Sequence, residues 1–189
     1  MTTARLALLV VLFVLSSLFS ATAQQPTAPA ASQEQSAPVA AKPDDVKSLD
    51  AIVAALYDVI SGPAGERNWG RFRSLFIPEA RLIPASKTAE GKITYRVLTT
   101  DDFVTRFGQN SMKQGFFEGE IARRTEQFGN IAHVWTTYES RRAPGEQPFA
   151  RGINSVQLFN DGTRWWIIEI VWDSERPGST IPSEYLPKK

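Results

Sequence analysis

Apolar residues recur every three or four positions after residue 45, which is the spacing of one face of a helix. They are Val46, Leu49, Ile52, Val53, Leu56, Val59 and Ile60. Asp44 and Asp45 precede this stripe, where the positive end of a helix dipole favours acidic side chains. Gly62 and Pro63 follow it and are typical of a helix end. We therefore expect one amphipathic helix that begins near Val46 and ends near Ile60.

Helix signals and apolar runs then alternate as far as Gly115. Asn68 is a candidate N-cap for a short second helix, which carries Trp69, Phe72, Leu75 and Phe76 before Pro78. Two strand-like segments follow at 80–84 and 93–98, with a polar loop at 86–92 between them. Thr99, with Asp102 three residues later, has the spacing of a capping box and predicts a third helix through 103–107.

A different pattern follows Gly115, because four long segments are rich in strand-forming residues. They span 117–128, 131–142, 149–159 and 163–172 and are joined by short polar turns. Helices at the start and a strand meander at the end predict an α+β fold, in which one curved, mostly antiparallel sheet wraps over the N-terminal helices.

The last hairpin decides which side chains point inward. Along its second strand, Trp166, Ile168, Ile170 and Trp172 share one face, while Trp165, Ile167, Glu169 and Val171 share the other. A two-residue turn at Asp161-Gly162 would pair Asn154 with Glu169, whereas a three-residue turn would pair Asn154 with Ile168 and Val156 with Trp166. We favour the three-residue turn because it separates apolar from polar positions more cleanly. Asn154 then points into the interior.

The N-terminus predicts export. Arg5 precedes an apolar run at 6–15, and small residues lead to a cleavage site after Ala23. A retained N-terminal anchor is the alternative, although the apolar run is short for a membrane span. Because the chain has no cysteine, it is not a lipoprotein. We expect a signal peptide at 1–23, a disordered Ala/Pro/Gln tether at 24–43, a domain at 44–176, and a C-terminal tail at 177–189. The mature protein is then secreted or periplasmic, with no membrane attachment.

Composition excludes several classes of function. The chain has 21 basic and 20 acidic residues, so there is no basic field of the kind that nucleic-acid binding requires. One histidine and no cysteine make a zinc or iron site improbable, so we predict no metal. The chain has no Gly-rich phosphate loop and no nucleophile motif, and we predict no cofactor.

Three strings resemble the nuclear transport factor 2-like superfamily, which includes SnoaL-like cyclases and ketosteroid isomerase relatives. The string NWGRFRSLFIPEARLI (68–83) is similar to its second helix and first strand, and GNIAHVWTTYESR (129–141) and RGINSVQLFNDGTRWWIIEIVWDSE (151–175) are similar to the closing strands of an exported subgroup. The resemblance implies a cone-shaped α+β fold with a pocket between helices and sheet, and dimerisation through the sheet. It specifies fold better than chemistry.

The resemblance also implies which catalytic side chains to look for, because the enzymes of this superfamily use known groups. Ketosteroid isomerase relatives use a tyrosine on the first helix and two pocket carboxylates. Tyr57 matches the tyrosine by position, but neither Glu79 nor Asp173 is a convincing match for a carboxylate. SnoaL-like cyclases use a pocket His and Asp, and His133 has no obvious Asp partner.

Several side chains are candidates for the lining of such a pocket. They are Tyr57, Trp69, Phe72, Tyr138, Asn154 and Trp172, and the competing interpretation is that the aromatic ones are simply core. Three further residues, His133, Arg151 and Glu169, are weaker candidates. Arg151 either binds an anion or pairs with Glu169 or Glu175, and His133 is either a general base or a surface histidine.

The outer face of the sheet predicts self-association, because Trp135 and Trp165 fall on the face that the helices leave uncovered. Our leading hypothesis is a non-catalytic exported domain, a homodimer through the sheet whose cone holds a small apolar or amphipathic ligand. The alternative is a lyase, isomerase or cyclase that transfers protons in the cone, using Tyr57, Asn154 and either His133 or Glu169. A third possibility is a partner-binding module displayed on the tether.

Overall fold

The computed structural model describes residues 40–188. The predicted signal peptide and nearly all of the predicted tether lie outside the described residues. The helices are α1 (Pro43–Val46), α2 (Leu49–Ile60), α3 (Trp69–Ser74), α4 (Thr100–Ser111) and the 3-10 turn η1 (Ser183–Tyr185). The strands are β1 (Phe76–Lys87), β2 (Ile93–Tyr95), β3 (Phe117–Phe128), β4 (Ile131–Arg141), β5 (Ala150–Asn160) and β6 (Trp165–Ser174).

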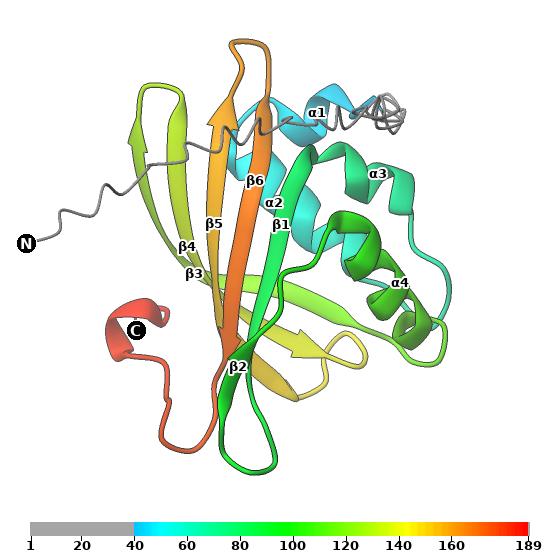
Figure 1. The fold of residues 1–189 in the computed structure, drawn as a ribbon, viewed down its shortest axis with the longest axis vertical. Coiled ribbons are helices and arrows are strands. Elements are labelled where there is room, and N and C mark those ends of the chain that lie inside the picture. Colours follow the sequence, from blue (N-terminus) through cyan, green and yellow to red (C-terminus); the bar gives the residue numbers. More distant parts are fainter. Residues whose placement is uncertain (1–39, 189) are drawn as a thin grey trace, which may run out of the picture. The chain divides into compact units, whose positions relative to one another are not determined.

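The six strands form one sheet in the order β2-β1-β6-β5-β4-β3. Only β1 and β6 are parallel neighbours; the other neighbouring pairs are antiparallel. Helices α2, α3 and α4 lie on one side of the curved sheet (Figure 1). The core lies between these two layers and includes Ile52, Phe72, Leu82, Val134 and Val156. The predicted α+β fold is confirmed.

The first predicted helix is in fact two helices. The chain breaks at Lys47 and Ser48, and the Ser48 hydroxyl accepts a hydrogen bond from the amide of Ala51 at 3.1 Å, which makes Ser48 the N-cap of α2. The apolar stripe continues across the break because Val46 is buried with the residues of α2. Periodicity alone therefore did not reveal the break.

The two later helices begin where the capping residues predict. The Asn68 side chain accepts a hydrogen bond from the amide of Arg71, and Thr99 and Asp102 form a reciprocal capping box at the start of α4. The strand after α3 is longer than the predicted segment 80–84, because it starts at Phe76 and continues through Pro78 and beyond Pro84.

A β-bulge in the last strand changes which residues face the helices. Gln157 pairs with Glu169 and Leu158 pairs with Ile167, so Ile168 is the extra residue. Both registers that we considered are wrong from the turn onward, because Asn160 pairs with Trp165: Asn154 lies opposite Trp172, and Val156 lies opposite Ile170. Asn154 nevertheless points inward, as predicted, and is buried.

The bulge also corrects the face assignment of the tandem tryptophans. Trp165 is buried in the core with Ile167, whereas we expected it on the outer face. Trp166 lies on the outer face instead, where its indole Nε1 donates to Asp161 at 2.7 Å and the guanidinium of Arg164 stacks 3.5 Å from its ring. Beyond the bulge the predicted faces are correct: Ile170 and Trp172 point toward the helices, and Glu169 and Val171 lie on the outer face.

The C-terminal segment packs against the outer face of the sheet. The ring of Tyr185 lies 5.8 Å from that of Trp135, and its carbonyl accepts a hydrogen bond from Thr137 at 2.6 Å. The Arg124 guanidinium stacks over the same tyrosine ring. Trp135 is therefore partly covered by the chain's own C-terminal segment. Within residues 40–188, no helix is long and apolar enough to cross a membrane.

Candidate functional site

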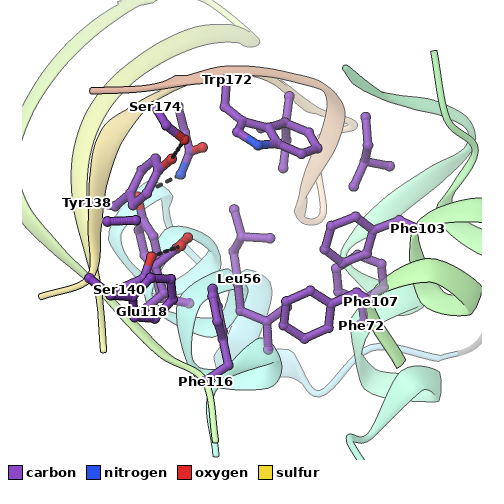
Figure 2. A pocket seen from close by; sticks show the side chains of 17 residues that line it. Leu56, Phe72, Phe103, Phe107, Phe116, Glu118, Tyr138, Ser140, Trp172 and Ser174 are labelled. Atoms are coloured by element: carbon purple, nitrogen blue, oxygen red, sulfur yellow. Dashed lines mark hydrogen bonds between the residues drawn. The ribbon is translucent and has the colours of Figure 1, made fainter. Parts of the chain in front are cut away.

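A cavity of about 290 Å³ lies between the helices and the concave face of the sheet. Its volume is near the lower limit for ligand pockets in proteins. The lining comes from α2, α3 and α4 on one side, from β1 and β3–β6 on the other, and from the two loops around Phe116 and Phe149. Figure 2 shows Phe72, Phe103 and Phe107 on one side and Tyr138, Ser140, Ser174 and Glu118 on the opposite side.

One wall of the cavity is a continuous set of aromatic rings. Phe103 stacks on Phe72 and on Phe107, with ring centroids 5.1 and 5.3 Å apart. Phe116 meets Phe107 edge-on at 4.9 Å, and Trp172 meets Phe103 edge-on at 6.3 Å. Each ring is held by a neighbour, so the wall is preorganised for a flat apolar group.

The opposite wall is polar and is built from cross-strand pairs. Glu118 on β3 lies opposite Ser140 on β4, and the Ser140 hydroxyl donates to the Glu118 carboxylate at 2.7 Å. The Tyr138 hydroxyl lies 3.0 Å from that of Ser174 on β6. Strands β3, β4 and β6 therefore present a carboxyl group and several hydroxyl groups to the same cavity.

Tyr57 connects the cavity to a chain of hydrogen bonds with a defined direction. The Thr136 hydroxyl donates to the Glu120 carboxylate, so its oxygen accepts the bond from the Tyr57 hydroxyl at 2.9 Å. The Tyr57 oxygen in turn accepts from the Asn154 amide at 3.1 Å. Arg123 fixes the carboxylate at the end of the chain with contacts of 2.9 Å. This network satisfies the buried polar groups of the wall.

Burial shifts the proton affinities of the groups that line the cavity. Burial raises the pKa of Glu118 to about 7, although the hydrogen bond from Ser140 acts in the opposite direction. Burial likewise raises the pKa of Tyr138 to about 12, and it raises that of Tyr57 further. Both tyrosines therefore stay protonated at neutral pH, and Glu118 is the lining group that titrates there.

The described residues hold no group of three or more Asp, Glu and His side chains placed to bind a metal ion. Among the described residues that line the cavity, Glu118 is the one that carries a carboxyl group. The chemistry available in the cavity is therefore that of one carboxyl group, several hydroxyl groups and one amide.

Comparison with solved structures identifies the fold. The chain is similar to a nuclear transport factor 2-like protein of unknown function from Pseudomonas putida, with a TM-score of 0.51 and 8% identity over 73% of this chain and 91% of that one. The chain has the nuclear transport factor 2-like fold. The resemblance stated from sequence is thereby confirmed at the level of the superfamily fold, and the exported subgroup stays a prediction.

Two proteins with a cystatin-like fold are similar to the same degree. One, from Nostoc punctiforme, has a TM-score of 0.51 and 8% identity over 66% of this chain and 86% of its own. The other, from Caulobacter vibrioides, has a TM-score of 0.50 and 12% identity over 70% of this chain and 90% of its own. No protein-family model matches the chain, and no curated protein matches its sequence.

In this nuclear transport factor 2-like fold, most of the predicted pocket residues meet in the cavity. Its lining includes Tyr57, Phe72, Tyr138, Asn154 and Trp172. Trp69 is outside the lining and supports it from behind, since its ring packs edge-on against Phe72 at 5.9 Å and Phe107 at 6.0 Å.

The three weaker candidates lie away from the cavity. His133 is on the outer face, where its Nε2 lies 3.0 Å from the hydroxyl of Ser155. Arg151 pairs with Glu175 at 2.7 Å, which is one of the two partners that we expected. Glu169 pairs with Arg81 at 2.5 Å. A role for His133 or Glu169 as a base in the cone is therefore wrong.

Sequence reasoning missed Glu118, together with Ser140, Ser174 and the rings of Phe103, Phe107, Phe116 and Phe149. Glu120 pairs with Tyr138 and Ala122 pairs with Thr137, so Ile121 forms a bulge in β3. Glu118 lies before this bulge, and it was missed because a carboxylate is an uncommon side chain on a strand face that packs against helices. The available signal was the position of Glu118 itself, a polar residue at the start of the strand and two positions after Phe116.

Proposed function

We propose that this protein is an exported binding domain whose cavity holds a small amphipathic molecule. The observation that carries the proposal is the division of the cavity into an aromatic wall and a polar wall. The stacked rings of Phe72, Phe103 and Phe107 suit an apolar group, and Glu118 and Ser140 suit a polar end. An apolar pocket with a few convergent polar groups is the usual form of a small-molecule site. The predicted signal peptide supports a role outside the cytoplasm.

A calorimetric titration with phenethyl alcohol tests this proposal, because the probe has one aromatic ring and one hydroxyl group. Ala150 lines the cavity, so the substitution Ala150→Phe should place a ring in the space and prevent binding. The control is Ala89→Phe, which changes an exposed residue in the turn between β1 and β2. We expect binding by the wild type and by Ala89→Phe, and none by Ala150→Phe. Equal binding by all three proteins, or by none, would overturn the proposal.

A second candidate function is proton transfer in the same cavity, and the position of Glu118 favours it. A carboxyl group with a pKa of about 7 in an apolar site is suited to act as a general base at neutral pH. Glu118 would take a proton from a carbon next to a ketone, and a lining hydroxyl such as that of Tyr138 would donate a hydrogen bond to the enolate oxygen.

Deuterium exchange tests this second candidate. Phenylacetone incubated with the protein in heavy water should gain deuterium next to its carbonyl, faster than it does in buffer and faster than with Glu118→Gln. Exchange at the buffer rate, or an equal rate with the variant, would remove the catalytic role while leaving the binding proposal in place.

A further inference from the structure

We infer that the ligand is a cation, namely a small amine whose ammonium group pairs with Glu118 and whose aromatic or aliphatic body packs on the ring wall. This inference rests on the proposed function and adds the charge of the ligand to it. The charge, the aromatic wall and the hydrogen-bond acceptors of the cavity support this inference.

The charge that the cavity carries is negative. Among the described residues that line it, Glu118 is the one side chain that carries a charge. A cation contacts one lining ring, since the Arg142 guanidinium stacks 3.8 Å from the ring centroid of Phe149. Arg142 is not part of the lining, and Glu120 is neutralised by Arg123. An anionic ligand would therefore meet a carboxylate with no compensating cation inside.

The aromatic wall provides a surface for the body of the ligand. Phe103, Phe107 and Phe116 line one side of the cavity and Trp172 closes another. Phe103 is stacked against both Phe72 and Phe107, so the wall is a packed apolar surface. An ion pair is stronger beside such a surface than in water, because the effective dielectric constant is lower. A carboxylate opposite this wall is therefore suited to an ammonium group that carries an apolar body.

The hydrogen-bond directions also match an ammonium group, which donates three bonds and accepts none. The proton of Ser140 is already donated to Glu118, and that of Tyr57 is donated to Thr136. The Ser140 oxygen can therefore offer only lone pairs, and the carboxylate can accept further bonds. The part of the polar wall around Glu118 and Ser140 is consequently richer in acceptors than in donors.

Calorimetry at pH 8 with three small aromatic probes tests the charge of the ligand. The probes are phenethylamine, a cation; phenethyl alcohol, which is neutral; and phenylacetate, an anion. We expect phenethylamine to bind at least about tenfold more tightly than the alcohol, as a charge-assisted bond to a carboxylate allows. Phenylacetate should bind most weakly. Glu118→Gln keeps the shape of the side chain but removes its charge, so it should abolish the advantage of the amine while retaining affinity for the alcohol.

The pH dependence of phenethylamine binding tests the pairing with Glu118 independently. Tyr57 from α2, and Tyr138 and Ser140 from β4, are the titratable or hydroxyl groups that act on Glu118, and both tyrosines stay neutral below pH 9. The affinity for phenethylamine should therefore rise between pH 5 and pH 8 as Glu118 ionises. An alcohol that binds as tightly as the amine at pH 8, or an amine affinity that does not change with pH, would overturn the inference and leave the proposed function standing. Binding of none of the three probes would overturn both.

Discussion

The phenol of Tyr138 lies across the backbone of Gly152, so close that a methyl group on residue 152 would stand 2.4 Å from the phenolic oxygen. The sheet register explains this approach, because Tyr138 on β4, Gly152 on β5 and Ser174 on β6 are direct neighbours. The tyrosine side chain crosses β5, which lies between the other two strands, and its hydroxyl lies 3.0 Å from that of Ser174. A glycine is needed at residue 152 because the polar wall of the cavity passes directly over it.

Replacing this glycine should therefore distort the cavity. Gly152→Ala would also place its methyl group 2.3 Å from the carbonyl oxygen of Asp173, which is backbone and cannot move freely. We expect a loss of about 1–3 kcal/mol in the free energy of unfolding, as for other overpacked sites. Gly119→Ala on β3 is the control, because nothing lies within 4 Å of its added methyl group. Equal denaturant midpoints for the two variants would show that the close approach is absent.

The tandem tryptophans should differ sharply in their contribution to stability. Trp165 is buried in the core, so Trp165→Ala should lower the free energy of unfolding by about 3–5 kcal/mol. Trp166 lies on the outer face, so Trp166→Ala should cost much less. Chemical denaturation of both variants measures the difference. A larger loss at Trp166 would contradict the bulge at Ile168.

Sequence patterns predicted the element order well, because local signals define it. The caps at Asn68 and Thr99 and the turn after Phe128 involve residues within three or four positions of one another. Such contacts are visible in a single sequence. The break at Ser48 was missed because the polar pair Lys47-Ser48 is compatible with the exposed face of a continuous helix as well as with a cap.

The site was only partly predictable. Asn154 was found because it interrupts an apolar strand face, and Tyr57 because it is an aromatic residue on the first predicted helix. Glu118 was not found, because a carboxylate is an uncommon side chain on a strand face that packs against helices. The bulge at Ile168 was not found either, and it turns Trp165 into the core. Nothing in the order of residues marks the position of a bulge when no glycine or proline accompanies it.

Stability should depend on pH through Glu118. Its pKa is raised to about 7 from an ordinary 4.5, so the folded state binds this proton more tightly than the unfolded state. The stabilising effect of the proton is complete below pH 4.5 and is lost as the pH rises from there through 7, with a total of about 3 kcal/mol. Because Glu118→Gln cannot ionise, it should gain stability relative to wild type across that interval. A constant difference between the two proteins from pH 5 to pH 8 in denaturant titrations would contradict the raised pKa.

Self-association through the sheet stays a prediction, but the residues expected to carry it change. Trp165 is in the core and Trp135 is partly covered by Tyr185. An exposed row of direct strand neighbours remains on the outer face: Phe128, Ile131 and Phe159, which are 85%, 58% and 37% exposed. We expect the wild type to sediment as a dimer through this row.

Substitution of the central residue of that row tests the expectation. Ile131→Glu should shift the protein to monomer at micromolar concentration without unfolding it. Ile93→Glu is the control, because Ile93 on β2 is 57% exposed, almost the same as Ile131. A monomeric wild type, or a dimer equally weakened by both substitutions, would exclude an interface at this row.

The central claim is that the cavity holds a small molecule, and native mass spectrometry of the protein purified from the organism that encodes it tests this claim most directly. The wild type should retain one small molecule per domain, which Ala150→Phe loses because the new ring fills the cavity. The control Ala89→Phe should retain it. A wild type that has the mass of the bare chain, or a bound molecule that survives Ala150→Phe, would contradict the account.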